Sequence, residues 1–440
     1  MRDLKQFDPP VDRKLDPRDL KQLDQQVMWH PFTQMAEWDP CVIASGDGNY
    51  LVDNEGRRYL DGVSSLWCNL HGHRHPRLDR ALLEQLEHIA HATFLGLTHE
   101  PGIRLGAALL EVAPPGLNRV FYSDSGSTAV EIALKQSFQF WQLRGQPSKQ
   151  RFLRLSEAYH GDTLGAVGVG GIDLFHRIFG PLLVRSIAIP TPAGTDGSES
   201  LTKLEHELDT HGGDIAALVL EPLVQGAAGM LVHPKGFLSR AADLCRRYSV
   251  HLIVDEVATG FGRTGTLFAC EQERVSPDFL CLAKGISGGY LPLAATLTTE
   301  DIYSAFLGTR AELKQFFHGH TYTANPLACA VGLESLAVLR ESSLANARAQ
   351  IPAMASALDR IAQLGGVQEA RRCGLMAGIQ IEPRAGRYLG AEICSRARAH
   401  GVILRPLGDV VVWMPPLTLA SHDLELLERA TAAAIREVLG

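Results

Sequence analysis

The chain has 440 residues, of which 45% are hydrophobic and 21% charged, and its formal net charge is −7. This length exceeds what one hydrophobic core usually supports, so we expect a large domain and a smaller one. The negative charge gives no reason to expect a nucleic acid or an anionic membrane as a partner. No stretch approaches the roughly 18 consecutive apolar residues of a membrane span, so we expect none.

The eight cysteines lie far apart along the chain, and no two of them form a C-x-x-C motif. This spacing argues against a zinc or redox motif, and scattered single cysteines suit a reducing compartment. The first residues, M-R-D-L-K-Q-F-D-P-P, lack the apolar core of a signal peptide. The sequence therefore predicts a cytoplasmic protein.

The first 70 residues read as an arm and a hairpin. Residues 1 to about 27 are polar and contain three prolines, and the segment W-H-P-F-T-Q-M that follows places Phe32 among aromatic and polar groups. Packing of the arm on the protein body remains an equal alternative to a functional role for these groups. Residues 46–62 alternate in polarity on both sides of Asn54-Glu55-Gly56, which predicts a hairpin.

Three histidines follow in the run His71-Gly72-His73-Arg74-His75. A zinc site needs three or four convergent ligands, but no cysteine or acid stands nearby at a ligand spacing. Arg74 is also a poor neighbour for a cation. We therefore predict no metal site.

A strand at 120–123 is followed by the small residues Asp124-Ser125-Gly126-Ser127-Thr128 and by a helix expected over 129–141. Free backbone N–H groups and hydroxyls at a helix N-terminus form a binding site for a phosphate. An ordinary N-cap by a serine or threonine is the alternative. The position of this turn before the residues described next favours phosphate.

Two further strands are expected at 152–155 and 216–220, and each is followed by a residue of interest. Tyr159 lies shortly after the first strand, where an aromatic side chain can stack on a planar ring; a core tyrosine is the alternative. Glu221 ends the second strand, where it fits a positioning role or a structural one. The sequence assigns no role to Asp162 or Arg263.

Two apolar runs, 251–254 and 279–283, end in Asp255 and Lys284. Such runs are typical of strands buried on both faces, and the C-terminal ends of those strands form the edge of an α/β sheet where ligands bind. A lysine amine and a carboxylate at one edge are what pyridoxal phosphate requires. The amine forms a Schiff base with the cofactor aldehyde, and the carboxylate keeps the pyridine nitrogen protonated. The pair therefore predicts a pyridoxal-phosphate enzyme, with no metal.

The segment D-E-V-A-T-G-F-G-R-T-G from Asp255, followed by Lys284, resembles the class III (ω-type) pyridoxal-phosphate aminotransferases, over about residues 29–416. W-H-P-F-T-Q-M, Y-H-G-D-T-L-G-A and G-F-G-R-T-G-T-L-F-A-C-E are most similar to the branch that converts 8-amino-7-oxononanoate to 7,8-diaminononanoate in biotin biosynthesis. Another ω-amino acid or diamine aminotransferase with a small keto acid acceptor is the alternative. An aminomutase is a further alternative.

The resemblance implies an α/β fold of the fold-type I class. We expect a large domain over 71–338 with a mostly parallel seven-stranded sheet, and a small α+β domain formed by 1–70 and 339–440. It also implies a homodimer in which the two chains share their active sites. The partners expected are small molecules, with neither nucleic acid nor membrane.

The resemblance also implies roles for individual residues. Lys284, Asp255 and Tyr159 would be catalytic, with Tyr159 on the face of the pyridine ring. Thr321 would reach the phosphate in the partner's site, and Arg405 would hold the distal carboxylate of the substrate. The residues expected to bind the cofactor are Gly126, Ser127, Tyr159, His160, Asp255, Lys284 and Thr321, and those expected to bind substrate are Phe32, Trp67, Tyr159, His320 and Arg405.

The chain departs from the adenosylmethionine-using members of the branch at four positions. Phe32 stands where they have a tyrosine, Leu66 where they have a tryptophan, His320 where they have a proline, and Val412 where they have a tyrosine. Leu66 removes an aromatic face suited to a sulfonium cation. The same combination resembles the lysine-using members, so we expect L-lysine to be a better amino donor than adenosylmethionine; neutral drift is the alternative.

Overall fold

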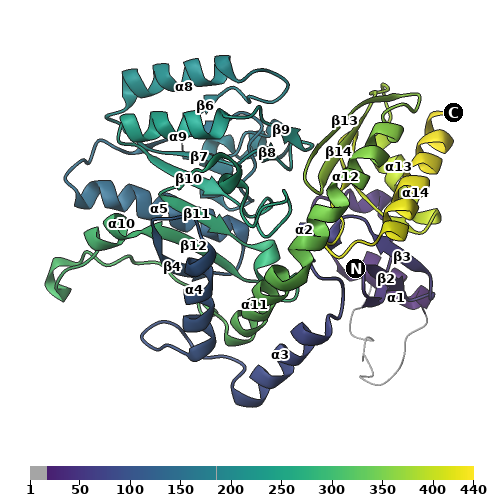
Figure 1. Cartoon of the computed structure of the whole chain (residues 1–440), viewed down its shortest axis with the longest axis horizontal. Helices are drawn as coiled ribbons and strands as arrows, with labels where there is room; N and C mark the ends of the chain where they lie inside the picture. The colour runs from purple at the N-terminus through teal and green to yellow at the C-terminus, as the bar shows by residue number, and fades with distance from the viewer. Residues whose placement is uncertain (1–16, 185) are drawn as a thin grey trace.

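The computed structural model describes residues 17–184 and 186–440 (Figure 1). The first 16 residues of the expected N-terminal arm lie outside the described residues. A sheet flanked by helices occupies one side of the molecule, and the N-terminal strands lie beside the C-terminal helices on the other side. Helix α11 (Pro326–Val338) runs from the first part towards the second.

The larger sheet has seven strands, as expected from the sequence. Their order is β4-β12-β11-β10-β7-β5-β6, and only β12 runs against the others. Every residue of β7, β10 and β11 is buried, which explains why these strands are continuous apolar runs. The strand bounds are β4 (Leu117–Ser123), β5 (Arg151–Leu155), β6 (Ser186–Ile189), β7 (Ile215–Leu220), β10 (His251–Asp255), β11 (Phe279–Leu282) and β12 (Ala294–Thr299).

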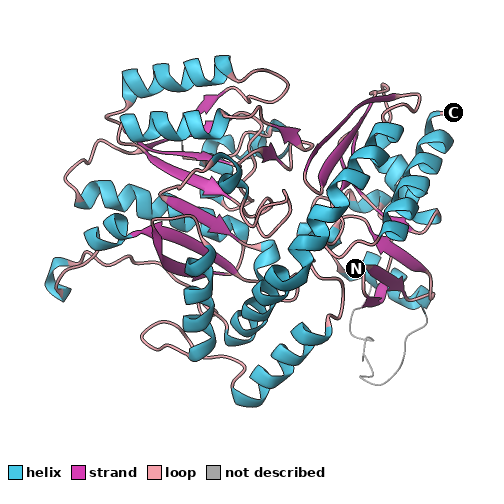
Figure 2. Cartoon of the chain, in the orientation of Figure 1, coloured by secondary structure: helices cyan, strands magenta, loops and turns pink. Residues whose placement is uncertain are grey.

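Helices cover both faces of this sheet (Figure 2). Helix α5 (Gly126–Leu143) buries Ala129, Val130 and Ala133 against the strands. It begins three residues before the predicted start at Ala129, because the Ser125 hydroxyl accepts a hydrogen bond from the Thr128 N–H and caps the helix there. The other helices of this part are α3 (Pro76–His88), α4 (Glu100–Val112), α8 (Ser198–His211), α9 (Phe237–Arg247) and α10 (Glu300–Ala305).

The second part combines both ends of the chain. Strand β15 (Val402–Ile403) pairs in parallel with β3 (Arg58–Asp61), so one sheet contains N-terminal and C-terminal strands. The hairpin expected from the sequence is formed by β2 and β3. The limits 1–70, 71–338 and 339–440 stay a prediction. The remaining elements of this part are β1 (Ile43–Asp47), β2 (Tyr50–Asp53), β13 (Val367–Cys373), β14 (Met376–Ile381), β16 (Arg405–Leu407), β17 (Val410–Trp413), α12 (Leu344–Ile361), α13 (Leu389–Ala399) and α14 (Ser421–Leu439).

The rest of the described chain forms further, mostly short elements. They are the helices α1 (Pro17–Val27), α2 (Ser64–Trp67), α6 (Leu164–Gly168) and α7 (Asp173–His176), the strands β8 (Val224–Gln225) and β9 (Leu231–Val232), the 3₁₀ turns at Met35–Glu37, Arg177–Leu182, Ala269–Glu273, Lys284–Ser287 and Arg310–Glu312, and a π-helical turn at Leu339–Ser343. Within residues 17–184 and 186–440, no helix is long and apolar enough to cross a membrane. The same residues contain no group of three or more His, Cys, Asp or Glu side chains that could hold a metal ion.

Candidate active site

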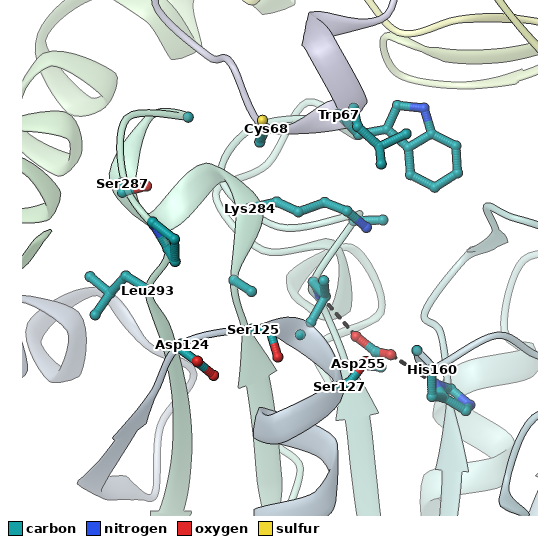
Figure 3. Close-up of a pocket in the computed structure, with 18 of the residues that line it drawn as sticks. Trp67, Cys68, Asp124, Ser125, Ser127, His160, Asp255, Lys284, Ser287 and Leu293 are labelled. Carbon is teal, nitrogen blue, oxygen red and sulfur yellow. Dashed lines mark hydrogen bonds and ion pairs between the residues drawn. The ribbon is translucent and has the colours of Figure 1, made fainter. Parts of the chain in front are cut away.

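A cavity of about 590 Å³ lies at the C-terminal edge of the seven-stranded sheet. Side chains from the ends of four strands, from the start of α5 and from the segment after β3 meet in it (Figure 3). Of the residues predicted from the sequence, the structure brings seven to its wall: Trp67, Gly126, Ser127, Tyr159, His160, Asp255 and Lys284.

Lys284 follows strand β11 and extends across the cavity, between the Trp67 indole and Asp255 (Figure 3). Its backbone has φ = 45°, a left-handed conformation that is rare for a residue with a side chain. The ammonium nitrogen lies 4.9 Å from the centre of the Trp67 ring. Burial lowers the pKa of Lys284, while the negative charges of Asp255 and Glu221 oppose that shift. The amine is therefore closer to its neutral, nucleophilic form than a surface lysine.

Asp255 ends strand β10 and is held at both carboxylate oxygens. Oδ1 accepts the N–H of Val257 at 2.9 Å, and Oδ2 lies 2.7 Å from Nδ1 of His160. Both side chains are buried, and Nε2 of His160 has no hydrogen-bond partner among the described residues. A buried carboxylate with a fixed orientation can hold a proton on a ring nitrogen that faces it.

Tyr159 is fixed by two acids. Its backbone N–H donates to Oε1 of Glu221 at 3.1 Å, and its hydroxyl donates to Asp162 at 2.7 Å. Glu221 also accepts the N–H of Gly226 at 2.7 Å, and burial raises the pKa of this carboxyl to about 7. Burial first, and then the hydrogen bond to Asp162, raise the pKa of Tyr159. Glu221 and Asp162 therefore hold Tyr159 at its backbone and at its hydroxyl, respectively.

The start of α5 forms a cradle with no room for additional side chains. A Cβ on Gly126 would lie 2.6 Å from Cγ1 of Val257, and a Cβ on Gly161 would lie 1.7 Å from the Ser127 hydroxyl oxygen. That oxygen accepts the N–H of Asp162 at 3.1 Å. Backbone N–H groups and a hydroxyl gathered at a helix N-terminus suit a phosphate group. The cradle, the carboxylate and the amine therefore match the three parts of pyridoxal phosphate.

The upper wall of the cavity contains Leu66 and Trp67, both named from the sequence, in a strained segment whose backbone conformation was not predicted. Ser64, Ser65 and Trp67 have φ angles of 52°, 61° and 68°. Left-handed backbone at non-glycine residues costs on the order of 1–3 kcal/mol each and is found where surrounding contacts enforce it. The guanidinium of Arg263, which is fully buried, donates to the carbonyl of Trp67 at 3.3 Å. The run D-G-V-S-S, which begins at the last residue of β3, was the available signal.

The remaining predicted residues lie outside the cavity wall of the described chain. Phe32 is 59% exposed and packs edge-on against Phe175 at 5.3 Å between ring centres. Thr321 is exposed, and Nε2 of His320 lies 3.9 Å from a carboxylate oxygen of Asp124 at the cradle. Arg405 lies in β16, close enough to Tyr159 for its charge to lower the pKa of that hydroxyl slightly against the larger effect of burial.

Comparisons with known proteins agree with this geometry. The family model for class III aminotransferases matches residues 33–435. The chain is 47% identical to the adenosylmethionine-8-amino-7-oxononanoate aminotransferase of Geobacter sulfurreducens, over 97% of this chain and 99% of the relative. It is 50% identical to the protein of that name from Nitratidesulfovibrio vulgaris, over 94% of this chain and 81% of the relative.

Solved structures resemble the whole chain as well. The crystal structure of the adenosylmethionine-8-amino-7-oxononanoate aminotransferase from Methanocaldococcus jannaschii matches with a TM-score of 0.93 and 39% identity, over 96% of this chain and 100% of that one. An amine transaminase from an uncultivated Pseudomonas species, solved in its PLP-bound form, matches with a TM-score of 0.88 and 34% identity, over 94% of this chain and 99% of that one.

Proposed function

Since the chain belongs to the class III aminotransferase family, we propose that it is the pyridoxal-phosphate-dependent transaminase that converts 8-amino-7-oxononanoate to 7,8-diaminononanoate in biotin biosynthesis. The observation that carries this proposal is the buried Lys284 amine facing Asp255, at the edge of a fold-type I sheet, in a chain 46–50% identical to several aminotransferases named for that substrate. L-lysine or adenosylmethionine would be the amino donor.

Pyridoxal phosphate supplies an aldehyde that condenses with amines and a pyridine ring that accepts electrons. Gly126 and Ser127 would hold its phosphate at the start of α5. Asp255, oriented by His160, would keep the ring nitrogen protonated, and Tyr159 would cover the ring face. Lys284 would hold the cofactor aldehyde at rest, and its amine, once freed, would act as the base that accepts and returns a proton beside the donor carbon. The lowered pKa of Lys284 suits this general-base role.

Arg405 would hold the distal carboxylate of the substrate. A guanidinium binds a carboxylate through two parallel N–H donors, which fixes direction as well as charge. Its nearness to Tyr159 supports a position at the substrate end of the site. Phe32, Trp67 and His320 would complete the substrate-binding surface.

A homodimer with shared sites is part of the proposal. Thr321 is exposed in the single chain, and its neighbours Phe317 and Tyr322 are 68% and 62% exposed. Apolar and aromatic groups exposed in one segment are typical of a surface that a partner covers. Thr321 would then contact the phosphate in the partner's site. A cytoplasmic location stays a prediction, which eight free cysteines support.

The decisive experiment is turnover with a defined acceptor. Purified protein loaded with pyridoxal phosphate would be incubated with 8-amino-7-oxononanoate and each donor, and 7,8-diaminononanoate would be detected by mass spectrometry. Parallel reactions would offer β-alanine or a diamine as donor and pyruvate as acceptor. Formation of the diaminononanoate supports the proposal; amination of pyruvate with none of 8-amino-7-oxononanoate would identify the chain as another ω-amino acid or diamine aminotransferase.

A further inference from the structure

We propose that Asp61 and His73 form a positioning pair that holds the segment Ser64–Trp67 in its strained conformation and so sets which amino acceptors the cavity admits. The specificity half of this inference rests on the proposed function. The pair lies outside the cavity wall, and His73 comes from the histidine run in which no metal site is expected.

The pair contacts the strained segment directly. Asp61 is fully buried, and its Oδ1 accepts the N–H of Ser65 at 2.8 Å. Its Oδ2 accepts the Ser65 hydroxyl at 3.0 Å and Nε2 of His73, also at 3.0 Å. Because the carboxylate only accepts hydrogen bonds, His73 donates. Ser65 is thus bound at backbone and side chain, at a residue with φ = 61° and ψ = −68°.

The pair itself is anchored. The backbone of His73 exchanges two hydrogen bonds with Gly48, with N···O distances of 2.6 and 3.2 Å. A Cβ on Gly46 would lie 2.7 Å from Cβ of His73, so the histidine is seated directly on the first hairpin. The N–H of Asp61 donates to the carbonyl of Asn49 at 2.9 Å. The pair therefore ties the strained segment to the hairpin formed by β1 and β2.

The strained segment places two side chains in the wall of the cavity. Leu66 and Trp67 both line it, and Trp67 covers the amine of Lys284 (Figure 3). At the near end, the Ser64 hydroxyl also donates to the carbonyl of Met414 at 2.7 Å, and at the far end Arg263 donates to the carbonyl of Trp67. Leu66 and Trp67 lie between or at these anchors, so a loss of the Asp61 and His73 contacts would shift the two side chains that bound the acceptor.

The variants separate the hydrogen bond from general packing. His73→Leu removes the donor, and His73→Gln restores an amide donor of similar reach. Because His73 also packs on the hairpin, Ser65→Ala serves as a second test that removes only the hydroxyl contact with Asp61. The matched control is His400→Leu, which breaks another histidine–carboxylate pair of 2.8 Å, with Glu437, on the surface.

Two measurements test the two halves of the proposal on the cofactor-loaded protein. In hydrogen–deuterium exchange, we expect the peptide covering 62–68 to exchange about tenfold faster in His73→Leu, less so in Ser65→Ala, and near the wild-type rate in His73→Gln and His400→Leu. In kinetics, we expect the ratio of kcat/KM for 8-amino-7-oxononanoate to that for pyruvate to fall about tenfold in His73→Leu, mainly through KM.

The outcomes are distinct. Unchanged exchange at 62–68 in both His73→Leu and Ser65→Ala would overturn the positioning role, and faster exchange with an unchanged ratio would overturn the specificity role. An equal loss for both acceptors would indicate general destabilisation and would also count against specificity. If the wild type does not aminate 8-amino-7-oxononanoate, the proposed function fails with the specificity half, while the exchange result still decides the positioning role.

Discussion

The floor of the cavity and the exposed segments outside its wall are built differently. The floor consists of Lys284, Asp255 and Glu221, which end buried strands of one sheet. Two other predicted residues, Phe32 and Thr321, lie outside the cavity wall on exposed segments of the single chain, which we call the rim. Strand ends are fixed by the sheet hydrogen bonds, so the floor is formed within one chain.

This difference separates two kinds of function. In the proposed function the floor carries the chemistry, while the rim and the strained upper wall would select the substrates. Changes in the floor should therefore abolish turnover with every substrate, and changes in the rim should alter the ranking of substrates. The predictions below test this separation, beginning with the largest effect expected.

Replacement of Lys284 should have the largest effect. Lys284→Ala removes both the amine that binds the cofactor aldehyde and the base that moves the proton, so we expect at least about a 10³-fold loss of kcat. The purified wild-type protein should be yellow, and the variant should lose that absorption band. Spectra and steady-state rates check both expectations. Normal transamination by the variant would show that the lysine is assigned wrongly.

A negative charge in the cradle should weaken cofactor binding. Ser127→Asp places a carboxylate against the phosphate, and the repulsion should lower cofactor affinity by about 100-fold. Equilibrium dialysis of the cofactor measures this effect directly. Ser421→Asp is the matched control, because it puts the same charge at the exposed first residue of helix α14, away from the cavity. Equal cofactor affinity in Ser127→Asp and the wild type would contradict the prediction that the cradle binds the phosphate.

Arg405 should discriminate between substrates and leave the chemistry intact. Loss of a charge-assisted bidentate contact is worth about 1.5–3 kcal/mol, which corresponds to roughly a 10–100-fold rise in KM for 8-amino-7-oxononanoate. Arg405→Lys should fall between the wild type and Arg405→Ala, because it keeps the charge without the fork. The half-reaction with the amino donor is the control. An equal loss of rate in that half-reaction would show that Arg405 maintains the structure of the site instead of binding the distal carboxylate.

Glu221 should make stability depend on pH. Burial raises its pKa from the ordinary 4.5 to about 7, so the folded chain binds a proton more tightly than the unfolded chain. The stabilisation is complete below pH 4.5 and is lost as the pH rises through 7, up to about 3 kcal/mol for this group. Urea midpoints of the cofactor-free wild type, compared with Glu221→Gln at pH 5 and 7.5, measure it. If the stability of the wild type and of Glu221→Gln changed equally with pH, the raised pKa of Glu221 would not be the cause of the pH dependence.

The floor could be predicted from the sequence because local patterns determine it. The runs before Asp255 and Lys284 formed strands β10 and β11 within a residue of the expected limits. The upper wall could not be predicted in the same way. The backbone of Ser64 and Ser65 is enforced by tertiary contacts, including a carbonyl 350 residues away at Met414. Neither composition nor periodicity reports such contacts, and the position of Thr321 in an assembly depends on a second chain.

The preference for one amino donor over another tests the upper wall and the rim through the smallest expected effect. Leu66 lines the cavity with an aliphatic side chain, which offers no aromatic face to a sulfonium cation, and Phe32 lacks a phenol hydroxyl. We therefore expect L-lysine to discharge the yellow form in a single half-reaction faster than adenosylmethionine. Because a cation–π contact is worth about 0.5–1 kcal/mol at a partly exposed site, Leu66→Trp should raise the adenosylmethionine rate about two- to fivefold and leave the lysine rate nearly unchanged. Stopped-flow absorbance with each donor measures both rates. If adenosylmethionine rapidly discharged the yellow form of the wild type and lysine did not, the expectation that lysine is the donor would be refuted. Adenosylmethionine, the donor in the relatives' names, would then be the donor of this chain as well.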